Sequence, residues 1–175
     1  YVYSGKEAKG EEPEFNRPAF DKGREVALHL NEVLTAMNLR SIVKTSGKTG
    51  LHIFVPIQRT LDFDATRRVS ETVSRHLQQR YPKDVTIDWS IDKRTGKIFI
   101  DYNMNARTRT LNCAYSPRGL LGAPVSMPLT WEELEHAYPT DFTIDTLFDR
   151  LAERPDVWRD FLLQKQSLEA ALGSR

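Results

Sequence analysis

Two glycines in the segment 46–50 constrain the fold of this chain most, because they separate two short apolar segments. Residues 41–44 and 51–57 have the length and composition of β-strands. Glycine tolerates a positive φ, so Gly47 and Gly50 suit a tight turn between adjacent strands. The sequence therefore predicts a strand–turn–strand unit.

Gly47-Lys48-Thr49 is also part of the P-loop pattern, but the spacing argues against a P-loop. A P-loop needs a glycine five positions before Gly47, and this chain has Ile42 there. A P-loop also leads into a helix N-terminus, whereas a strand is predicted from Leu51 onward. The turn is therefore expected to lie between strands.

Helices are predicted on both sides of this unit. Residues 20–38 repeat apolar side chains with helical spacing, and a second helix starts with Asp62 or Asp64 as its N-cap. From Thr130 onward the chain is predicted to be helical, because Thr130 and Glu133 form a capping-box pattern. A terminal helix is expected to carry Trp158, Phe161 and Leu162.

Alternating polarity predicts further strands at residues 85–90 and 97–102. The turn-forming residues 92–96 between them predict a β-hairpin. Residues 108–115 are expected to form another strand. This order of helices and strands predicts an α+β domain around a mostly antiparallel sheet, and the polar residues 1–19 are expected to form a surface loop or insertion.

The composition excludes several classes of protein. Residue Cys113 is the single cysteine among 175 residues, which excludes an intrachain disulfide framework and a multi-cysteine zinc site. The sequence has no apolar run of membrane-spanning length, so a reducing, cytoplasmic compartment is expected. The net charge is only +1, so any nucleic-acid binding must come from a local basic patch.

Donor side chains are concentrated around the two glycines of the turn. They are Lys44, Ser46, Lys48, Thr49 and His52. A tight turn explains the glycines but not these side chains. Backbone N–H groups of a glycine loop can form an anion-binding nest, to which lysine and hydroxyl groups add donors. His52 taken alone is also compatible with a hydrogen-bonded structural histidine.

Two charged residues elsewhere are candidates for the same site. Asp101 ends an apolar strand, where a carboxylate needs a partner, although a strand-end cap or salt bridge explains it equally well. Arg118 lies in a Pro-Arg-Gly turn that can aim a guanidinium, but an exposed turn arginine is the simpler interpretation. Basic side chains placed to meet nucleic-acid phosphates are Lys93, Arg94, Arg107 and Arg109.

Three motifs together carry a family resemblance. They are Lys44–His52, Ile100–Asn105 and Tyr115–Gly119. In order and spacing they resemble the polymerase domain of bacterial and archaeal ligase D, a family of the archaeo-eukaryotic primase superfamily that acts in non-homologous end joining. The resemblance extends from about Phe20 to Glu169. It implies an RRM-like primase/polymerase core, of which this chain is expected to be the C-terminal part.

The resemblance also implies a function. It implies a template-dependent, ribonucleotide-preferring nucleotidyltransferase that fills or extends ends at double-strand breaks by two-metal phosphoryl transfer with Mn²⁺ or Mg²⁺. The implied partners are DNA ends with a template strand, NTP or dNTP, a ligase domain and Ku, in a nucleoid-associated location.

Particular residues receive roles from the same resemblance. Contacts with the triphosphate of the incoming nucleotide are implied for Ser46, Lys48, His52 and Arg118. Lys93 and Arg94 are expected to position the template or the nucleotide. Asp101 is expected to be the catalytic carboxylate that binds metal.

The chain departs from the family pattern in two places. Thr49 stands where the family usually has a basic residue, and Lys48 lies one position earlier. The family's first metal motif, Asp-x-Asp, has no match in residues 1–19. Either it precedes Tyr1, or Glu14-Phe15-Asn16 is a degenerate version, which would make the chain a catalytically inactive nucleotide- or DNA-end-binding module. The isolated segment is expected to be inactive as a polymerase, and a primase of the same superfamily stays open.

Overall fold

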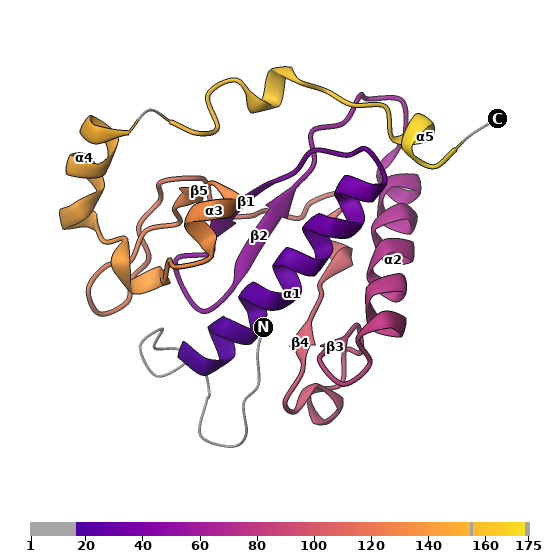
Figure 1. Cartoon of the computed structure of the whole chain (residues 1–175), viewed down its shortest axis with the longest axis horizontal. Coiled ribbons are helices and arrows are strands. Elements are labelled where there is room, and N and C mark those ends of the chain that lie inside the picture. Colours follow the sequence, from indigo (N-terminus) through magenta and orange to yellow (C-terminus); the bar gives the residue numbers. More distant parts are fainter. Residues whose placement is uncertain (1–16, 155, 174–175) are drawn as a thin grey trace.

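The computed structural model describes residues 17–154 and 156–173 and has an α+β fold (Figure 1). The α-helices are α1 (Arg17–Ala36), α2 (Phe63–Arg80), α3 (Trp131–Leu134), α4 (Ile144–Glu153) and α5 (Leu168–Ala171). The strands are β1 (Ile42–Thr45), β2 (Leu51–Phe54), β3 (Val85–Thr86), β4 (Ile98–Phe99) and β5 (Pro128–Leu129). The 3₁₀ helices of the described residues are η2 (Ile91–Arg94), η3 (Tyr102–Met104), η4 (Pro139–Asp141) and η5 (Phe161–Leu163).

The predicted strand–turn–strand unit is confirmed as the antiparallel pair β1–β2. In this pair Lys44 lies opposite His52. Strand β5 joins the other edge of β1, also antiparallel, so the sheet order is β2-β1-β5 and β1 is central. The predicted mostly antiparallel α+β architecture is therefore confirmed.

The predicted β-hairpin at residues 85–102 is wrong. Strands β3 and β4 pair in parallel, with Val85 opposite Ile98 and Thr86 opposite Phe99. The residues between them form a broad loop that contains η2 instead of a tight turn. Alternating polarity identifies a strand but not its direction, and here Val85 and Ile98 pack into one cluster with α1 and α2.

Two further predictions are wrong. Residues 108–115 form no strand, because the chain turns through positive φ values at Thr108 and Tyr115. Trp158 does not lie on a terminal helix, since residues 157–160 form turns; Phe161 and Leu162 lie in the short η5, and the last α-helix is α5. The third strand of the main sheet is β5, which the sequence pattern did not indicate.

The two long helices agree with the sequence pattern. The N-cap of α2 is Asp62, whose carboxylate accepts a hydrogen bond from the amide of Ala65. Helix α1 starts at Arg17, within the expected polar loop of residues 1–19, while residues 1–16, with Glu14 and Asn16, lie outside the described residues. No helix in the described ranges is long and apolar enough to cross a membrane.

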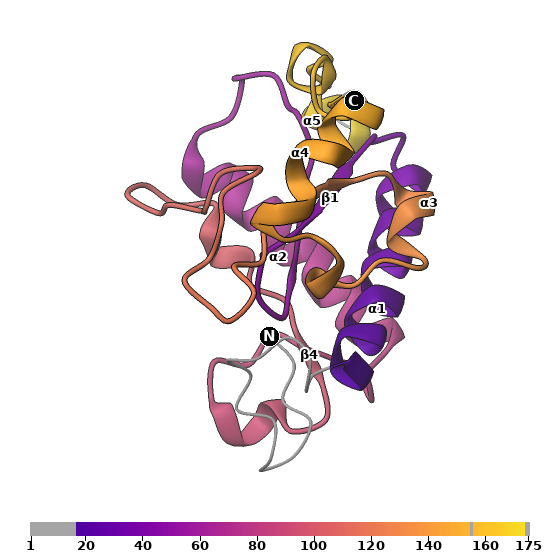
Figure 2. The same ribbon diagram turned by 90° about the vertical axis from the view of Figure 1, so that its left-hand side faces the viewer.

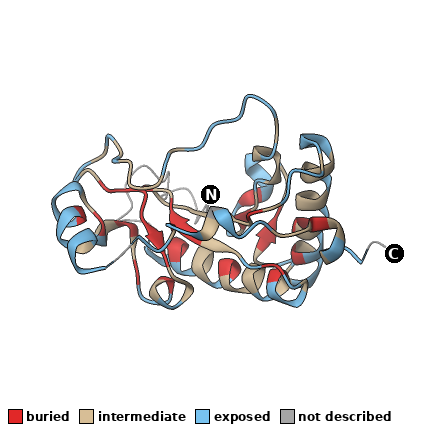
Figure 3. Ribbon diagram, turned by 90° about the horizontal axis from the view of Figure 1, so that it is seen from above, coloured by how far each residue is buried: buried red, intermediate tan, exposed pale blue. Residues whose placement is uncertain are grey.

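Helix α1 holds the two sheets together. It contacts β2 of the main sheet, β4 of the parallel pair and α2 (Figure 1). Phe20 and Ala27 of α1 pack into the cluster under the main sheet, whereas Val26 packs with Leu77 and Val85 on the other side. Burial follows this arrangement: the strands and the inner faces of the helices are buried, and the outer face of α4 is exposed (Figure 3).

The irregular chain between η3 and β5 is important for the site. In Figure 2 its first part extends away from the helices, on the left of the view. It then returns to the sheet, where the amide of Tyr115 donates to the carbonyl of Ser126 and the amide of Arg118 donates to that of Pro124. This return places residues 112–126 beside the β1–β2 turn.

The predicted capping box at Thr130 and Glu133 is confirmed, and Glu133 has additional partners. Its carboxylate accepts from the backbone amide of Thr130 at 2.9 Å. It also pairs with Arg150 at 2.8 Å and with Arg154, both from α4. One half-buried carboxylate therefore caps α3 and fastens α4 to the core.

Replacing Glu133 by alanine should destabilise the fold, because the cap is lost and two guanidinium groups lose their shared partner. We expect a loss of about 1–3 kcal/mol in the free energy of unfolding, measured by urea titration at pH 7. Glu132→Ala is the matched control, since Glu132 lies in the same helical turn but is exposed. Equal losses in both variants would contradict the role of Glu133.

Candidate phosphate-binding site

The turn between β1 and β2 is organised by the hydroxyl of Ser46. Its Oγ accepts hydrogen bonds from the backbone amides of Lys48 and Gly50, each at 3.1 Å. The Ser46 amide donates to the Gly50 carbonyl at 2.8 Å, and the Asn112 side chain donates to the Ser46 carbonyl at 3.0 Å. Two amides of the expected anion nest therefore already have a partner, whereas the hydroxyl proton of Ser46 remains available to an anion.

Arg118 lies directly against this turn. A Cβ atom added at Gly47 would lie 2.6 Å from the Cγ of Arg118, which is closer than real contacts allow, and Gly47 has φ +73°. Glycine is required here both for the backbone conformation and for the approach of the arginine. The structure thus brings together two residues, Gly47 and Arg118, that are 71 positions apart in the sequence.

Lys44 is a buried cation on the central strand. Only 1% of its surface is exposed, and its Nζ donates to the Oγ of the fully buried Ser126 in a short hydrogen bond. Burial lowers the pKa of Lys44 to about 8; a negative charge on Cys113 opposes this shift, and the Arg118 guanidinium adds to it. A lysine ammonium is seldom buried unless an anion compensates it.

His52 lies beside Lys44 in the sheet. Burial, followed by the positive charges of Lys44 and Arg118, lowers the pKa of His52 to about 4, so the ring is neutral at pH 7. Its Nδ1 is buried and has no hydrogen-bond partner among the residues described. Its ring packs edge-on against Phe54. An unpaired ring nitrogen in a basic environment is suited to a ligand.

The side chains of Lys48 and Thr49 are partly exposed at the tip of the same turn. Within residues 17–154 and 156–173, neither makes a side-chain hydrogen bond or ion pair. They are therefore free to bind a ligand. Together with Ser46, His52 and Arg118, the turn presents a set of donors and cations on one part of the surface.

Asp101 is not joined to this turn. Its carboxylate is exposed, caps η3 and accepts from the amide of Asn103 at 3.0 Å. Asn103 in turn accepts from Arg67 of α2. In the described part of the chain no hydrogen bond or ion pair links Asp101 to residues 46–52, and no group of three or more His, Cys, Asp or Glu residues could hold a metal ion. The described residues therefore do not form a complete metal site.

Arg94 is buried inside its own loop. Its guanidinium donates to the carbonyls of Asp88 and Trp89 at 2.8 and 2.7 Å and stacks on the Phe99 ring, 3.6 Å from the centroid. These contacts hold the loop that contains η2, with the Trp89 ring exposed. Lys93 is exposed and lies 3.7 Å from the Asp88 carboxylate. Of the two residues predicted to position the template, only Lys93 has its charge at the surface.

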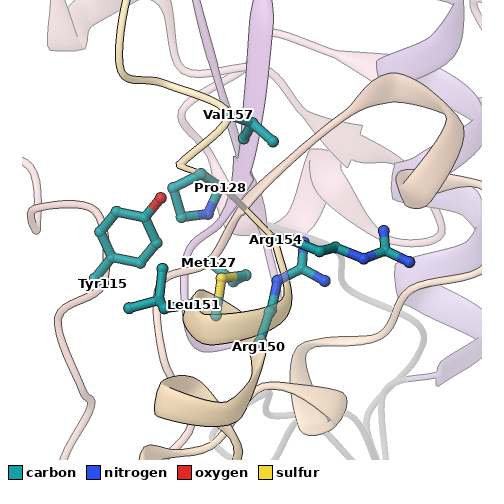
Figure 4. A pocket seen from close by; sticks show the side chains of 7 residues that line it. All are labelled: Tyr115, Met127, Pro128, Arg150, Leu151, Arg154 and Val157. Carbon is teal, nitrogen blue, oxygen red and sulfur yellow. The ribbon is translucent and has the colours of Figure 1, made fainter.

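A shallow pocket lies on the other side of β5, against α4 (Figure 4). It is lined by Tyr115, Met127, Pro128, Arg150, Leu151, Arg154 and Val157. Both arginines already pair with Glu133, and the Tyr115 hydroxyl donates to Asp156. None of the predicted site residues lines this pocket, so it is separate from the phosphate-binding candidate.

Sequence reasoning missed the supporting residues of the site. Ser126 and Asn112 contact the turn from positions far along the chain, and no local pattern marks them. Lys44 was noticed as a donor, but not as a buried one. In the antiparallel pair Lys44 lies directly opposite His52, and directly opposed residues share a face of the sheet. A strand–turn–strand prediction that also fixed this register would have placed the two side chains together.

Gly47→Ala should destabilise the turn, whereas Gly50→Ala should be tolerated. Gly47 combines a positive φ with the contact to Arg118, but a Cβ at Gly50 meets only the Ser46 hydroxyl, at 3.7 Å. We expect a loss of about 1–3 kcal/mol for Gly47→Ala and less than about 1 kcal/mol for Gly50→Ala in urea unfolding at pH 7. Equal stability of the two variants would contradict this geometry.

Comparison with known proteins gives consistent matches. The family described as the LigD primase-polymerase domain matches residues 13–158. The multifunctional non-homologous end joining protein LigD of Pseudomonas aeruginosa is 34% identical over 143 residues, which cover 80% of this chain and 17% of that protein. Its counterpart from Mycolicibacterium smegmatis is 31% identical over 133 residues, with 76% and 18% coverage.

The fold is similar to a solved structure from the same group. The polymerase domain of Mycobacterium tuberculosis ligase D, in complex with DNA, matches with a TM-score of 0.76 and 26% identity. The match covers 84% of this chain and 51% of that chain, so this chain spans about half of that polymerase domain and less than a fifth of the two LigD proteins. By sequence and by fold, the chain belongs to the LigD primase-polymerase domain family.

Proposed function

We propose that this chain binds the incoming nucleotide in a template-dependent polymerase that fills or extends DNA ends in non-homologous end joining. The residues of the β1–β2 turn, with Arg118, bind the triphosphate, and ribonucleotides are the preferred substrates. DNA ends, a ligase domain and Ku are the proposed partners. Membership of the LigD primase-polymerase domain family and the matched structure with DNA support this role.

One observation carries the proposal: basic side chains gather at the turn without an acidic partner. Arg118 is close enough to lower the pKa of Lys44, and both Lys44 and Arg118 lower that of His52, while no ion pair in the described ranges involves any of the three. Like charges in a partly buried site repel, and their repulsion raises the free energy of the folded chain. A triphosphate, with several negative charges, relieves this repulsion.

The donors around the turn match the needs of a triphosphate. The Ser46 hydroxyl can donate a proton to a phosphate oxygen while it still accepts from the two turn amides. The Arg118 guanidinium can form two parallel hydrogen bonds with a phosphate. Lys48 adds a partly exposed positive charge at the tip of the turn. Charges held in these positions stabilise the negative charge that develops on departing pyrophosphate.

We further propose that Asp101 supplies one carboxylate to Mn²⁺ or Mg²⁺, which favour oxygen ligands. The carboxylate is exposed and accessible. Because the described residues contain no group of three acidic or other ligands, the remaining ligands would have to come from outside them. We therefore derive no catalytic step through a metal from these residues alone.

The same finding favours a second candidate function, a nucleotide- or DNA-end-binding module without catalysis. The turn and Arg118 do not require a metal in order to bind phosphate. Under this alternative the chain binds a nucleoside triphosphate but supports no extension when placed in a complete polymerase domain. Primer extension therefore distinguishes the two functions.

Arg118→Ala should weaken nucleotide binding. A charged hydrogen bond contributes about 1.5–3 kcal/mol, so we expect the dissociation constant for ATP to rise roughly 10- to 100-fold in isothermal titration calorimetry. Arg75→Ala is the control, because Arg75 is an exposed arginine whose ion pair in the described part of the chain is with Glu71 on its own helix. Unfolding curves of both variants should match the parent chain. An unchanged ATP affinity in Arg118→Ala would contradict the proposal.

Asp101→Asn should abolish template-dependent extension by a complete polymerase domain that contains these residues. Asparagine keeps the oxygen that accepts from the Asn103 amide, so the cap of η3 should persist while the negative charge is lost. Asp149→Asn, on the exposed face of α4, is the control. Extension at the parent rate by the Asp101→Asn domain would refute the metal-binding role of Asp101.

A further inference from the structure

Lys44 has an unusual environment for a charged residue. Its ammonium carries three N–H donors, but Ser126 Oγ is the single side-chain or backbone acceptor that it meets within the described residues. Ser126 itself is fully buried and donates to the Thr45 carbonyl at 2.8 Å. The amine is thus held in a fixed position with little compensation for its charge.

Lys44 lies close to the proposed triphosphate site, but its side chain is not exposed at the surface. Lys44 lies on the central strand, between His52 on β2 and Pro128 on β5. The turn that follows it starts two residues later, and Arg118 covers that turn. With 1% of its surface exposed, Lys44 acts on a ligand through its charge and not as a surface contact.

We propose that Lys44 is a positioning residue of the triphosphate site, held by Ser126 beneath the β1–β2 turn, and that triphosphate binding takes up a proton on its amine. The proton comes from the solvent, the amine becomes an ammonium, and no covalent bond to the ligand forms. This inference rests on the proposed function and adds to it a link between nucleotide affinity and pH.

The charges around Lys44 favour proton uptake by its amine when a triphosphate binds. In the free chain, burial and the nearby Arg118 disfavour the ammonium, and its pKa is about 8. A bound triphosphate brings negative charge that favours the ammonium and raises this pKa. By linkage, binding takes up a proton where the free amine is neutral, above pH 8, and affinity falls by up to tenfold per pH unit there. Well below pH 8 the amine is already charged and takes up nothing.

Besides Lys44 itself, Cys113 is the group near the site that could take up the proton when a triphosphate binds. His52, with a pKa of about 4, is neutral at pH 9 and takes up no proton there. Cys113 acts electrostatically on Lys44, so its thiolate is a second group that would gain a proton when an anion binds. A serine at position 113 separates these two sources.

The test is calorimetric titration of the chain with ATP in EDTA at pH 9, in two buffers with different ionisation enthalpies. The terminal phosphate has a second pKa near 6, so ATP itself is fully ionised at this pH. We expect an uptake approaching one proton per ATP, which is retained in Cys113→Ser and lost in Lys44→Arg, because arginine stays charged. The ATP affinity of Lys44→Arg should also be independent of pH between 7.5 and 9.5.

Two results would overturn the inference: ATP binding at pH 9 without proton uptake, or an uptake that disappears in Cys113→Ser and persists in Lys44→Arg. If Lys44→Arg does not fold, carbon-13 NMR of the lysine side chains in the parent chain gives the answer. One lysine should titrate near pH 8 in the free chain and above pH 10 with ATP bound. Failure to bind ATP at any pH would overturn the proposed function as well.

Discussion

The burial of the Lys44 ammonium in the central strand is the constraint on which the rest of the site depends. A charge removed from water must be compensated, and among the residues that the structure describes the Ser126 hydroxyl alone provides a hydrogen-bond contact. Arg118 increases the imbalance because its guanidinium adds positive charge nearby, whereas His52 responds to the two cations by staying neutral. The folded chain therefore keeps uncompensated positive charge at this position, and the proposed triphosphate would compensate it.

The irregular segment between η3 and β5 builds this site. It supplies Asn112 to the turn, Arg118 over Gly47, and Ser126 to Lys44. Its backbone is tied to itself and to the sheet by amide–carbonyl bonds, not by a regular strand. A regular strand would alternate its side chains between two faces, whereas this segment turns repeatedly and directs several side chains toward one place. Because the segment is irregular, its side chains can converge on the β1–β2 turn.

The sequence predicted those parts of the fold that local rules govern. The two long helices, the capping box at Thr130 and the strand–turn–strand unit were predicted because periodicity, caps and glycines act over a few residues. The prediction of a hairpin at residues 85–102 is wrong because the direction of a strand follows from packing, and here the two strands are parallel. Arg94 binds carbonyls of the loop between them and so holds it in an open form. The strand at 108–115 failed because positive φ values interrupt it.

For the site, the sequence by itself determined the chemistry: a glycine turn with serine, lysine and histidine donors, and a Pro-Arg-Gly turn. The family comparisons show the LigD primase-polymerase domain family, which the same motifs resemble. Only the tertiary structure decided that Lys44 is buried, that Arg118 lies on Gly47 and that Asp101 lies apart from the turn. Burial and proximity across 71 positions depend on how distant segments pack, and no short pattern in the sequence encodes such packing.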